Sequence, residues 1–215
     1  MKPFGLGEFT YLLLGLRWTV LLSLMGFVGG SLAGLAIALA RTSDNSVLRR
    51  ASAAWIALFQ GTPLLLQLFV VYYGVALMNI SIDPWFAVAI GLTLHASAFL
   101  GEIWRGAIQS LNKGQIEAAR ALGIRYWVRM RHVVLPQALK ISLPATVGFL
   151  VQLLKGTSLA AIVGFTELTR AGSIVSNQTY RPLLIFGVVG VLYFMMCWPL
   201  SIYGSKLERR LGVGR

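Results

Sequence analysis

Five long stretches of the sequence carry almost no charge, and they limit the folds that are open to this chain. They cover residues 18–40, 51–80, 84–105, 141–166 and 182–205. Each is long enough to cross a bilayer, which takes roughly 20 apolar residues. We therefore expect an all-α, polytopic membrane protein with five transmembrane helices in a single domain over residues 1–215.

The composition and the charge agree with a membrane protein. Hydrophobic residues make up 57% of the chain, charged residues make up 12%, and the mean hydropathy is +0.74. A typical soluble domain has about 25% charged residues. The net charge of +12 would suggest nucleic-acid binding in a soluble protein, but here the basic residues gather in loops between apolar spans. Topology explains the charge, and no nucleic-acid partner is expected.

Basic loops also predict the orientation of the chain. After the first span come Arg41, Arg49 and Arg50; after the third come Arg105, Lys113, Arg120, Arg125, Arg129, Arg131 and Lys140; after the fifth come Lys206, Arg209, Arg210 and Arg215. The positive-inside rule places these loops on the cytoplasmic side of the membrane. With five spans, the amino terminus lies outside and the carboxy terminus lies in the cytoplasm.

Residues 106–140 form a polar insert on the cytoplasmic side, and a short helix is predicted inside it. Alanines favour a helix over residues 115–122, and Gly123 suits the left-handed conformation that closes a helix. A second short helix is expected over residues 126–132, ended by Leu135 and Pro136. Helices this short are marginal alone in water, so the first one needs a surface to dock against. An ordinary basic loop would explain the arginines but not the alanines or their spacing.

The spacing in this insert resembles the EAA loop of ABC importer permeases, whose short helix inserts into a groove of a cytoplasmic ATPase. Residues 117–119 read Glu-Ala-Ala, and Gly123, Leu135 and Pro136 fit the pattern position by position. Val133 stands where the pattern usually has Ile. The resemblance implies an ATPase-coupling role for Glu117, Ala118, Ala119, Ala121, Leu122, Gly123, Leu135 and Pro136.

Three further segments resemble the branch that imports polar amino acids such as histidine, glutamine, arginine and glutamate. Residues 59–69 (FQGTPLLLQLF) resemble FRGTPLLVQLF, residues 101–110 (GEIWRGAIQS) resemble AEIFRGGIQS, and residues 154–159 (LKGTSL) resemble KDTSL. Gln60 replaces an Arg and Gly156 an Asp of that branch, and both departures bear on substrate charge. The likeness implies the type I importer fold, a second permease subunit that is identical or paralogous, an ATPase dimer, and a binding protein outside.

Polar residues within or beside the spans are the candidates for a substrate pathway, because such groups are costly in lipid and usually functional. The candidates are Gln60, Thr62, Pro63, Gln67, Ser97, Glu102, Lys155, Thr157, Ser158 and Glu167. Lys155 either faces a cavity, where Gly156 and its neighbours loosen the helix, or extends its stem to the membrane interface. The Gly-Thr-Pro run at 61–63 predicts a kink in the second span.

Three polar residues in or beside the spans have simpler structural interpretations. Glu102 is expected to pair with Arg105 rather than to line water, and His95 is expected to be a hydrogen-bonded packing residue. Glu167 is expected to pair with Arg170, with a place near an outer gate as the alternative.

Glycines in the first span form a Gly-x-x-x-Gly pair at Gly30 and Gly34, which lets another helix approach closely. We expect packing inside one subunit rather than a dimer seam.

Missing motifs narrow the function further. The sequence has no Gly-rich phosphate loop with a following Lys, so we expect ATP and Mg²⁺ on a partner ATPase and no cofactor on this chain. No catalytic or metal-binding constellation is apparent. Two rival functions are a membrane-embedded enzyme that uses His95 and Glu102 as an acid and base, and an ATP-independent channel or secondary transporter.

Overall fold

The computed structural model describes residues 4–211, except for the side chain of Lys113, and nearly all of this part is helical. The helices are α1 (Leu6–Arg41), α2 (Ser46–Gln60), α3 (Leu64–Leu77), α4 (Pro84–Gln109), α5 (Lys113–Ala121), α6 (Tyr126–Arg129), α7 (Leu135–Gly156), α8 (Leu168–Thr179) and α9 (Pro182–Leu211). A π turn (Met130–Val134) precedes α7 and a 3₁₀ turn (Thr157–Ala161) follows it. The described residues contain no strand, so the all-α prediction is confirmed. Arg215, one of the basic residues behind the predicted side of the carboxy terminus, lies outside the described residues.

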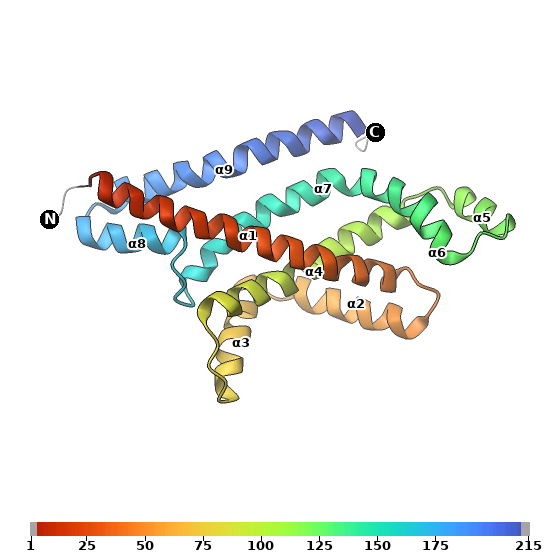
Figure 1. Ribbon diagram of the computed structural model, residues 1–215, viewed down its shortest axis with the longest axis horizontal. Helices are drawn as coiled ribbons and strands as arrows, with labels where there is room; N and C mark the ends of the chain where they lie inside the picture. Colours follow the sequence, from red (N-terminus) through yellow and green to blue (C-terminus); the bar gives the residue numbers. More distant parts are fainter. Residues whose placement is uncertain (1–3, 212–215) are drawn as a thin grey trace.

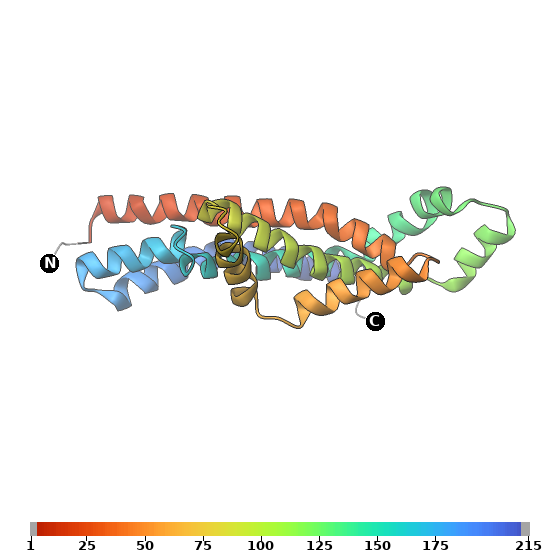
Figure 2. The same cartoon turned by 90° about the horizontal axis from the view of Figure 1, so that it is seen from below.

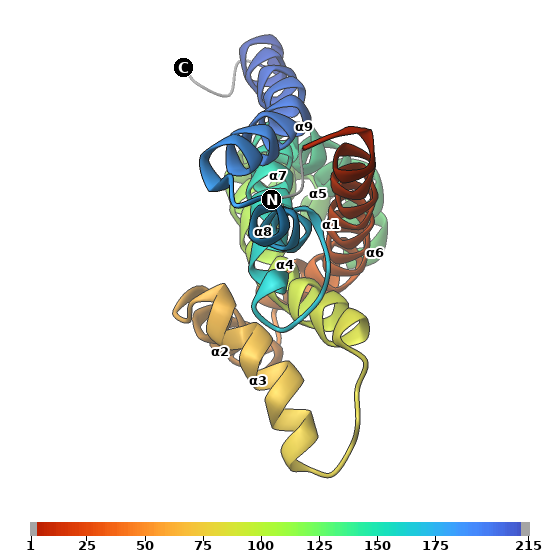
Figure 3. The ribbon, with the colours of Figure 1, turned by 90° about the vertical axis from the view of Figure 1, so that its left-hand side faces the viewer.

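The long helices lie side by side in one bundle, with short helices at both ends (Figure 1). Helices α5 and α6 project from one end, and α8 lies at the other (Figure 2). Seen along the bundle, α1 covers one side, α9 and α2 lie far apart, and α4 and α7 run between them (Figure 3). The polar insert therefore forms an end of the molecule, away from the first residues of α1.

Within residues 4–211, four helices are long and apolar enough to cross a membrane: α1, α4, the continuous run Tyr126–Ala161, and α9. A fifth crossing requires α2 and α3 together, which bend by 101° at the break between them. The expected kink within residues 51–80 is therefore a complete interruption. The start of α3 packs into the core through Leu68, and the rest of the helix points away from the bundle (Figure 1). Pro63 has no N–H group and disfavours helical dihedrals at the preceding residue, which explains why the helix ends at Gln60.

Close packing between α1 and α4 forms the centre of the bundle. A Cβ atom built on Gly30 would lie 2.3 Å from the Cβ of Ala96, and one built on Gly34 would lie 3.1 Å from the backbone nitrogen of Gly101. Only glycine permits this approach of the two backbones. The prediction that the Gly-x-x-x-Gly pair packs within one subunit is confirmed.

The helix expected to end at Leu135 and Pro136 does not end there. Helix α6 continues through the π turn into α7, and Pro136 lies in the first turn of α7. In the π turn the N–H of Leu135 bonds to the carbonyl of Met130, five residues back. This wider turn relieves the clash that a proline ring makes with the carbonyl four residues before it. The sequence prediction was wrong because it treated Pro136 as a terminator.

A substitution at Gly30 tests the contact between α1 and α4. Gly30→Leu should destabilise the purified protein by about 1–3 kcal/mol or more, because the new side chain has no room beside Ala96. Gly190→Leu in α9 is the matched control, because a Cβ there has no neighbour within 4 Å. Thermal unfolding in detergent measures both variants. Equal melting temperatures for the two variants would contradict this packing.

Candidate functional site

Helix α5 has defined ends. The side chain of Asn112 caps its start by accepting a hydrogen bond from the N–H of Gly114 (2.9 Å). At its end Gly123 adopts a left-handed conformation with φ +71°, as predicted. There the N–H of Gly123 donates to the carbonyl of Arg120 (2.9 Å), and the N–H of Ile124 donates to that of Ala119 (3.0 Å). These bonds satisfy carbonyls that the last helical turn would leave free.

One face of α5 is held by its own chain. Ala119 is 4% exposed. Ile116 packs against a cluster at the ends of α1, α4 and α7, formed by Ala38, Ala107, Ile108, Leu111, Met130, Val134 and Ala138. The amide nitrogen of Gln137 donates to the side-chain oxygen of Gln115 (2.8 Å). The docking surface that so short a helix needs is thus partly supplied by the chain itself.

The opposite face of α5 is open. Glu117, Ala118 and Ala121 are exposed, and Leu122 is 79% exposed. The predicted coupling residues therefore divide into two groups, because Ala119 faces inward whereas the others on this helix face outward. Leu135 packs against the cluster at the helix ends, and Pro136 is exposed at the start of α7.

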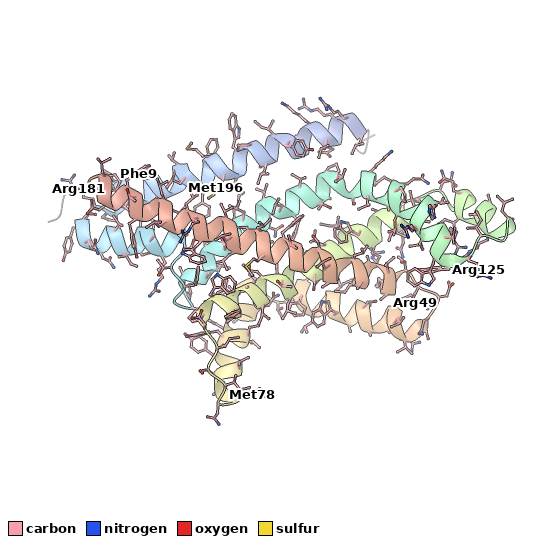
Figure 4. All side chains as sticks on the ribbon, viewed as in Figure 1. Phe9, Arg49, Met78, Arg125, Arg181 and Met196 are labelled. Carbon is pink, nitrogen blue, oxygen red and sulfur yellow. The ribbon has the colours of Figure 1, made fainter. Side chains whose placement is uncertain are left out.

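Sequence reasoning missed two features beside α5. Trp127 and Val128 of α6 are 70% and 50% exposed, so they add exposed apolar surface to the loop that follows α5. Arg129 is buried, donates to the carbonyl of Ile124 (3.4 Å), and lies 5.7 Å from the centre of the Tyr126 ring. The signal available in the sequence was the presence of an aromatic and an aliphatic residue, Trp127 and Val128, within a basic loop. Arg49 and Arg125 lie at this end of the molecule, and Phe9 and Arg181 lie at the other (Figure 4).

The break between α2 and α3 gathers several of the predicted pathway residues. Gln60 is exposed at the end of α2, and Pro63 begins α3. The hydroxyl of Thr62 donates to the carbonyl of Leu58 (2.8 Å). Gln67 is buried, and its side chain contacts Thr62. A cavity of about 340 Å³ lies at this bend, and its lining is almost entirely apolar: Leu58, Phe59, Thr62, Leu66, Gln67, Val70, Val71 and Leu94.

The polar residues of α4 are engaged in local contacts. The hydroxyl of Ser97 donates to the carbonyl of Leu94 (2.6 Å) and accepts a hydrogen bond from the indole nitrogen of Trp55 (3.0 Å). Glu102 accepts a hydrogen bond from Nε of Arg105 (2.7 Å), so the predicted pairing is confirmed.

His95 is buried and hydrogen-bonded to Gln67 (3.0 Å), as expected of a packing residue. Its partner is Gln67 and not Glu102, so the acid and base pair of the enzyme hypothesis is not assembled.

Lys155 lies near the end of α7, where the α-helix changes to a 3₁₀ turn. The 3₁₀ turn begins at Thr157, and the hydroxyls of Thr157 and Ser158 bond back to the carbonyls of Leu154 and Lys155 (2.7 Å each), so this turn is tighter than the loosened helix that the sequence predicted. Lys155 is exposed, and no carboxylate pairs with it in the described part of the chain. It borders an open cavity of about 350 Å³ together with Tyr193, Phe194, Cys197, Trp198 and Ser201. Both predicted alternatives for Lys155, a place facing a cavity and a stem that extends to the membrane interface, stay predictions.

Glu167 is fully buried, and its environment differs from the prediction. Its carboxylate accepts hydrogen bonds from the backbone N–H groups of Thr169 and Arg170 (2.9 Å each), from the hydroxyl of Tyr193 (2.8 Å) and from that of Thr19 (3.3 Å). The guanidinium of Arg170 instead donates to the carbonyl of Ala161 (3.0 Å). The expected ion pair between Glu167 and Arg170 is therefore wrong. The carboxylate caps α8, and a cap needs the first N–H groups of the helix rather than a side-chain charge.

Comparison with known proteins assigns this arrangement to a class. A family model for the binding-protein-dependent transport system inner membrane component matches residues 11–212. The probable amino-acid ABC transporter permease protein YckA of Bacillus subtilis (strain 168) is 34% identical over 203 residues, which cover 94% of this chain and 90% of YckA. The glutamine transport system permease protein GlnP of Escherichia coli (strain K12) is 33% identical over 201 residues, which cover 93% of this chain and 92% of GlnP.

Solved structures agree. A chain from the crystal structure of an amino acid ABC transporter with histidines matches with a TM-score of 0.87 and 33% identity, over 98% of this chain and 100% of that one. The inward-facing MetNI methionine ABC transporter shares the fold, with a TM-score of 0.77 and 22% identity over 97% of this chain and 99% of the other.

The bundle, its broken span and the exposed helix at one end thus define a membrane subunit of a type I ABC importer. The chain belongs to the family of binding-protein-dependent transport system inner membrane components. It is a permease subunit and not an enzyme, so the hypothesis built on His95 and Glu102 is set aside. A channel that works without ATP is also inconsistent with this family.

Substitution of Glu167 tests its role as a buried cap. Glu167→Leu should lower stability by about 3 kcal/mol or more, because several donors lose their acceptor at once. Tyr193→Phe removes one donor and should cost only about 1 kcal/mol. Thermal unfolding of the purified protein compares the two variants. If Glu167→Leu were no worse than Tyr193→Phe, the carboxylate would not organise this junction.

Proposed function

We propose that this chain and a second permease subunit, identical or paralogous, enclose a pathway for polar amino acids. ATP binding and hydrolysis, with Mg²⁺, take place on a dimer of cytoplasmic ATPase subunits, and a binding protein delivers substrate from outside. This chain itself carries no cofactor and contacts membrane lipid and no nucleic acid. The observation that carries the proposal is α5, a helix held by its own chain on one face and open on the other.

The open face of α5 suits a groove on an ATPase. Ala118 and Ala121 offer small side chains that permit close approach, and Leu122 adds an apolar contact at the helix end. On the inward face, Ile116 packs against a cluster that also contains residues from the ends of α1, α4 and α7. A partner that moves α5 therefore acts through this cluster on three long helices, and rigid spans convert this motion into alternating access.

The assignment to amino acids is supported by relatives and by the chemistry of the chain. YckA is described as a probable amino-acid permease and GlnP as a glutamine permease. Every free amino acid carries a carboxylate, and Lys155 is an exposed cation without a carboxylate partner among the described residues. Gln60 and Gly156 replace charged residues of the resembling branch, so we assign no particular amino acid to this chain.

The proposed orientation follows from the charges and from α5. The end that bears α5 faces the cytoplasm, where the ATPases lie, and Arg49 and Arg125 belong to the same end (Figure 4). The amino terminus then lies outside and the carboxy terminus inside, in a bacterial inner membrane. This arrangement satisfies the positive-inside rule.

The two faces of α5 predict two kinds of defect. Ala118→Leu, and likewise Ala121→Leu, should abolish co-purification with the ATPase and leave the melting temperature of the permease unchanged, because these positions are exposed. Ala119→Leu should lower the melting temperature as well, because this position is 4% exposed. Overpacking at such a position reduces the free energy of unfolding by about 1–3 kcal/mol. Co-purification from detergent and thermal unfolding measure the two properties. Normal ATPase binding by the Ala118 and Ala121 variants would refute the coupling role.

Lys155 predicts a defect in transport itself. Lys155→Met should reduce ATP-driven uptake into proteoliposomes by tenfold or more, since a charged hydrogen bond contributes about 1.5–3 kcal/mol. Lys140→Met makes the same chemical change on an exposed lysine near the start of α7 and should transport normally. Uptake is measured with the binding protein and the ATPase present. Equal uptake by the two variants would remove Lys155 from the pathway.

A further inference from the structure

The break between α2 and α3 leaves backbone carbonyls that need new partners. In an unbroken helix, the carbonyl of Phe59 would accept a hydrogen bond from residue 63, but Pro63 has no N–H. Two neighbouring carbonyls are satisfied locally, that of Ala57 by the N–H of Gly61 (2.9 Å) and that of Leu58 by the hydroxyl of Thr62 (2.8 Å). Inside a membrane no water is at hand to bond the remaining ones.

Gln67 supplies the missing donors. Its side-chain nitrogen lies 2.8 Å from the carbonyl oxygen of Phe59, 3.0 Å from that of Thr62 and 3.0 Å from the hydroxyl of Thr62. Side chains lean toward the start of their helix, so a residue in the first turn of α3 reaches back across the break. Gln67 thus replaces the hydrogen bond that Pro63 cannot make.

The other end of the same carboxamide connects the break to the bundle. The side-chain oxygen of Gln67 lies 3.0 Å from Nδ1 of His95 in α4. Because the amide nitrogen of Gln67 already faces carbonyl acceptors, its oxygen must accept, and Nδ1 of His95 carries the hydrogen. The imidazole ring packs against Phe99 (4.5 Å between ring centres) and Phe149 of α7 (6.2 Å).

We propose that Gln67 is a positioning residue that fixes the angle of the broken span and ties it to α4 through His95. Gln67 is 7% exposed, and both ends of its carboxamide are occupied within the chain. It is therefore not a ligand for substrate, although its place beside the break suggests one. Gln60 is exposed on the other side of the break and stays available to the pathway.

Hydrogen–deuterium exchange of the assembled importer tests this role. Gln67→Met keeps the length of the side chain and removes both donors and the acceptor. Amides of α3, residues 64–77, should exchange on the order of tenfold faster, because buried carbonyls lose their partners. Gln152→Met is the matched control on an exposed position of α7 and should exchange like the wild type. His95→Phe keeps an aromatic ring beside Phe99, loses only the donor to Gln67, and should give a smaller increase in the same segment.

A transport measurement separates a positioning residue from a ligand, and this part alone rests on the proposed function. With Gln67→Met, uptake of every amino acid that the importer carries should fall by one common factor. A change in the relative rates of different amino acids would make Gln67 a ligand and overturn the proposal. Unchanged exchange of α3 in both the Gln67 and His95 variants would overturn it as well. If the wild type carried no amino acid, the proposed function would fail, while the exchange result would still decide the role of Gln67.

Discussion

Backbone polar groups inside a bilayer have no water to bond, and the rest of this structure depends on that constraint. Most of them are satisfied within the long helices, where hydroxyls also bond back to carbonyls three or four residues before them, as Ser23 does to Thr19. Where a helix is interrupted, a side chain takes over the missing bonds. Gln67 does so at the break after α2, and Glu167 does so at the start of α8. Both interruptions are thus stabilised by buried polar side chains that also bind a second helix.

The same constraint is absent at the end that bears α5, and the interactions there differ accordingly. Ile116 and Ala119 lie on the buried face of the helix, where the contacts are apolar. The opposite face is exposed to solvent and free to contact another protein. A short helix gains order from such packing that its own sequence cannot supply. The chain itself thus orders part of the helix that we propose as the contact for a partner.

Local patterns in the sequence predicted the features that neighbouring residues determine. The three-residue spacing of Glu102 and Arg105 predicted their ion pair, and Gly123 predicted the end of α5. The position of the break followed from Pro63, but its angle of 101° depends on contacts that are not local.

Features set by distant parts of the chain escaped prediction. The carboxylate of Glu167 bonds to Thr19 and Tyr193, which no sequence spacing brings to it. Pro136 was wrongly predicted to end a helix, because the π turn before it is a feature of the backbone that no single residue in the sequence indicates. The roles of the coupling and pathway residues remain predictions for the experiments above.

The continuous run Tyr126–Ala161 joins the end that bears α5 to the 3₁₀ turn beside Lys155, the two regions that we propose for coupling and for transport. Pro136 and Pro144 both lie within this run and do not interrupt it. Had Pro136 ended a helix, a loop would lie between these regions and absorb movement. Without such a loop, a displacement of one end of the run is passed along a hydrogen-bonded backbone to the other.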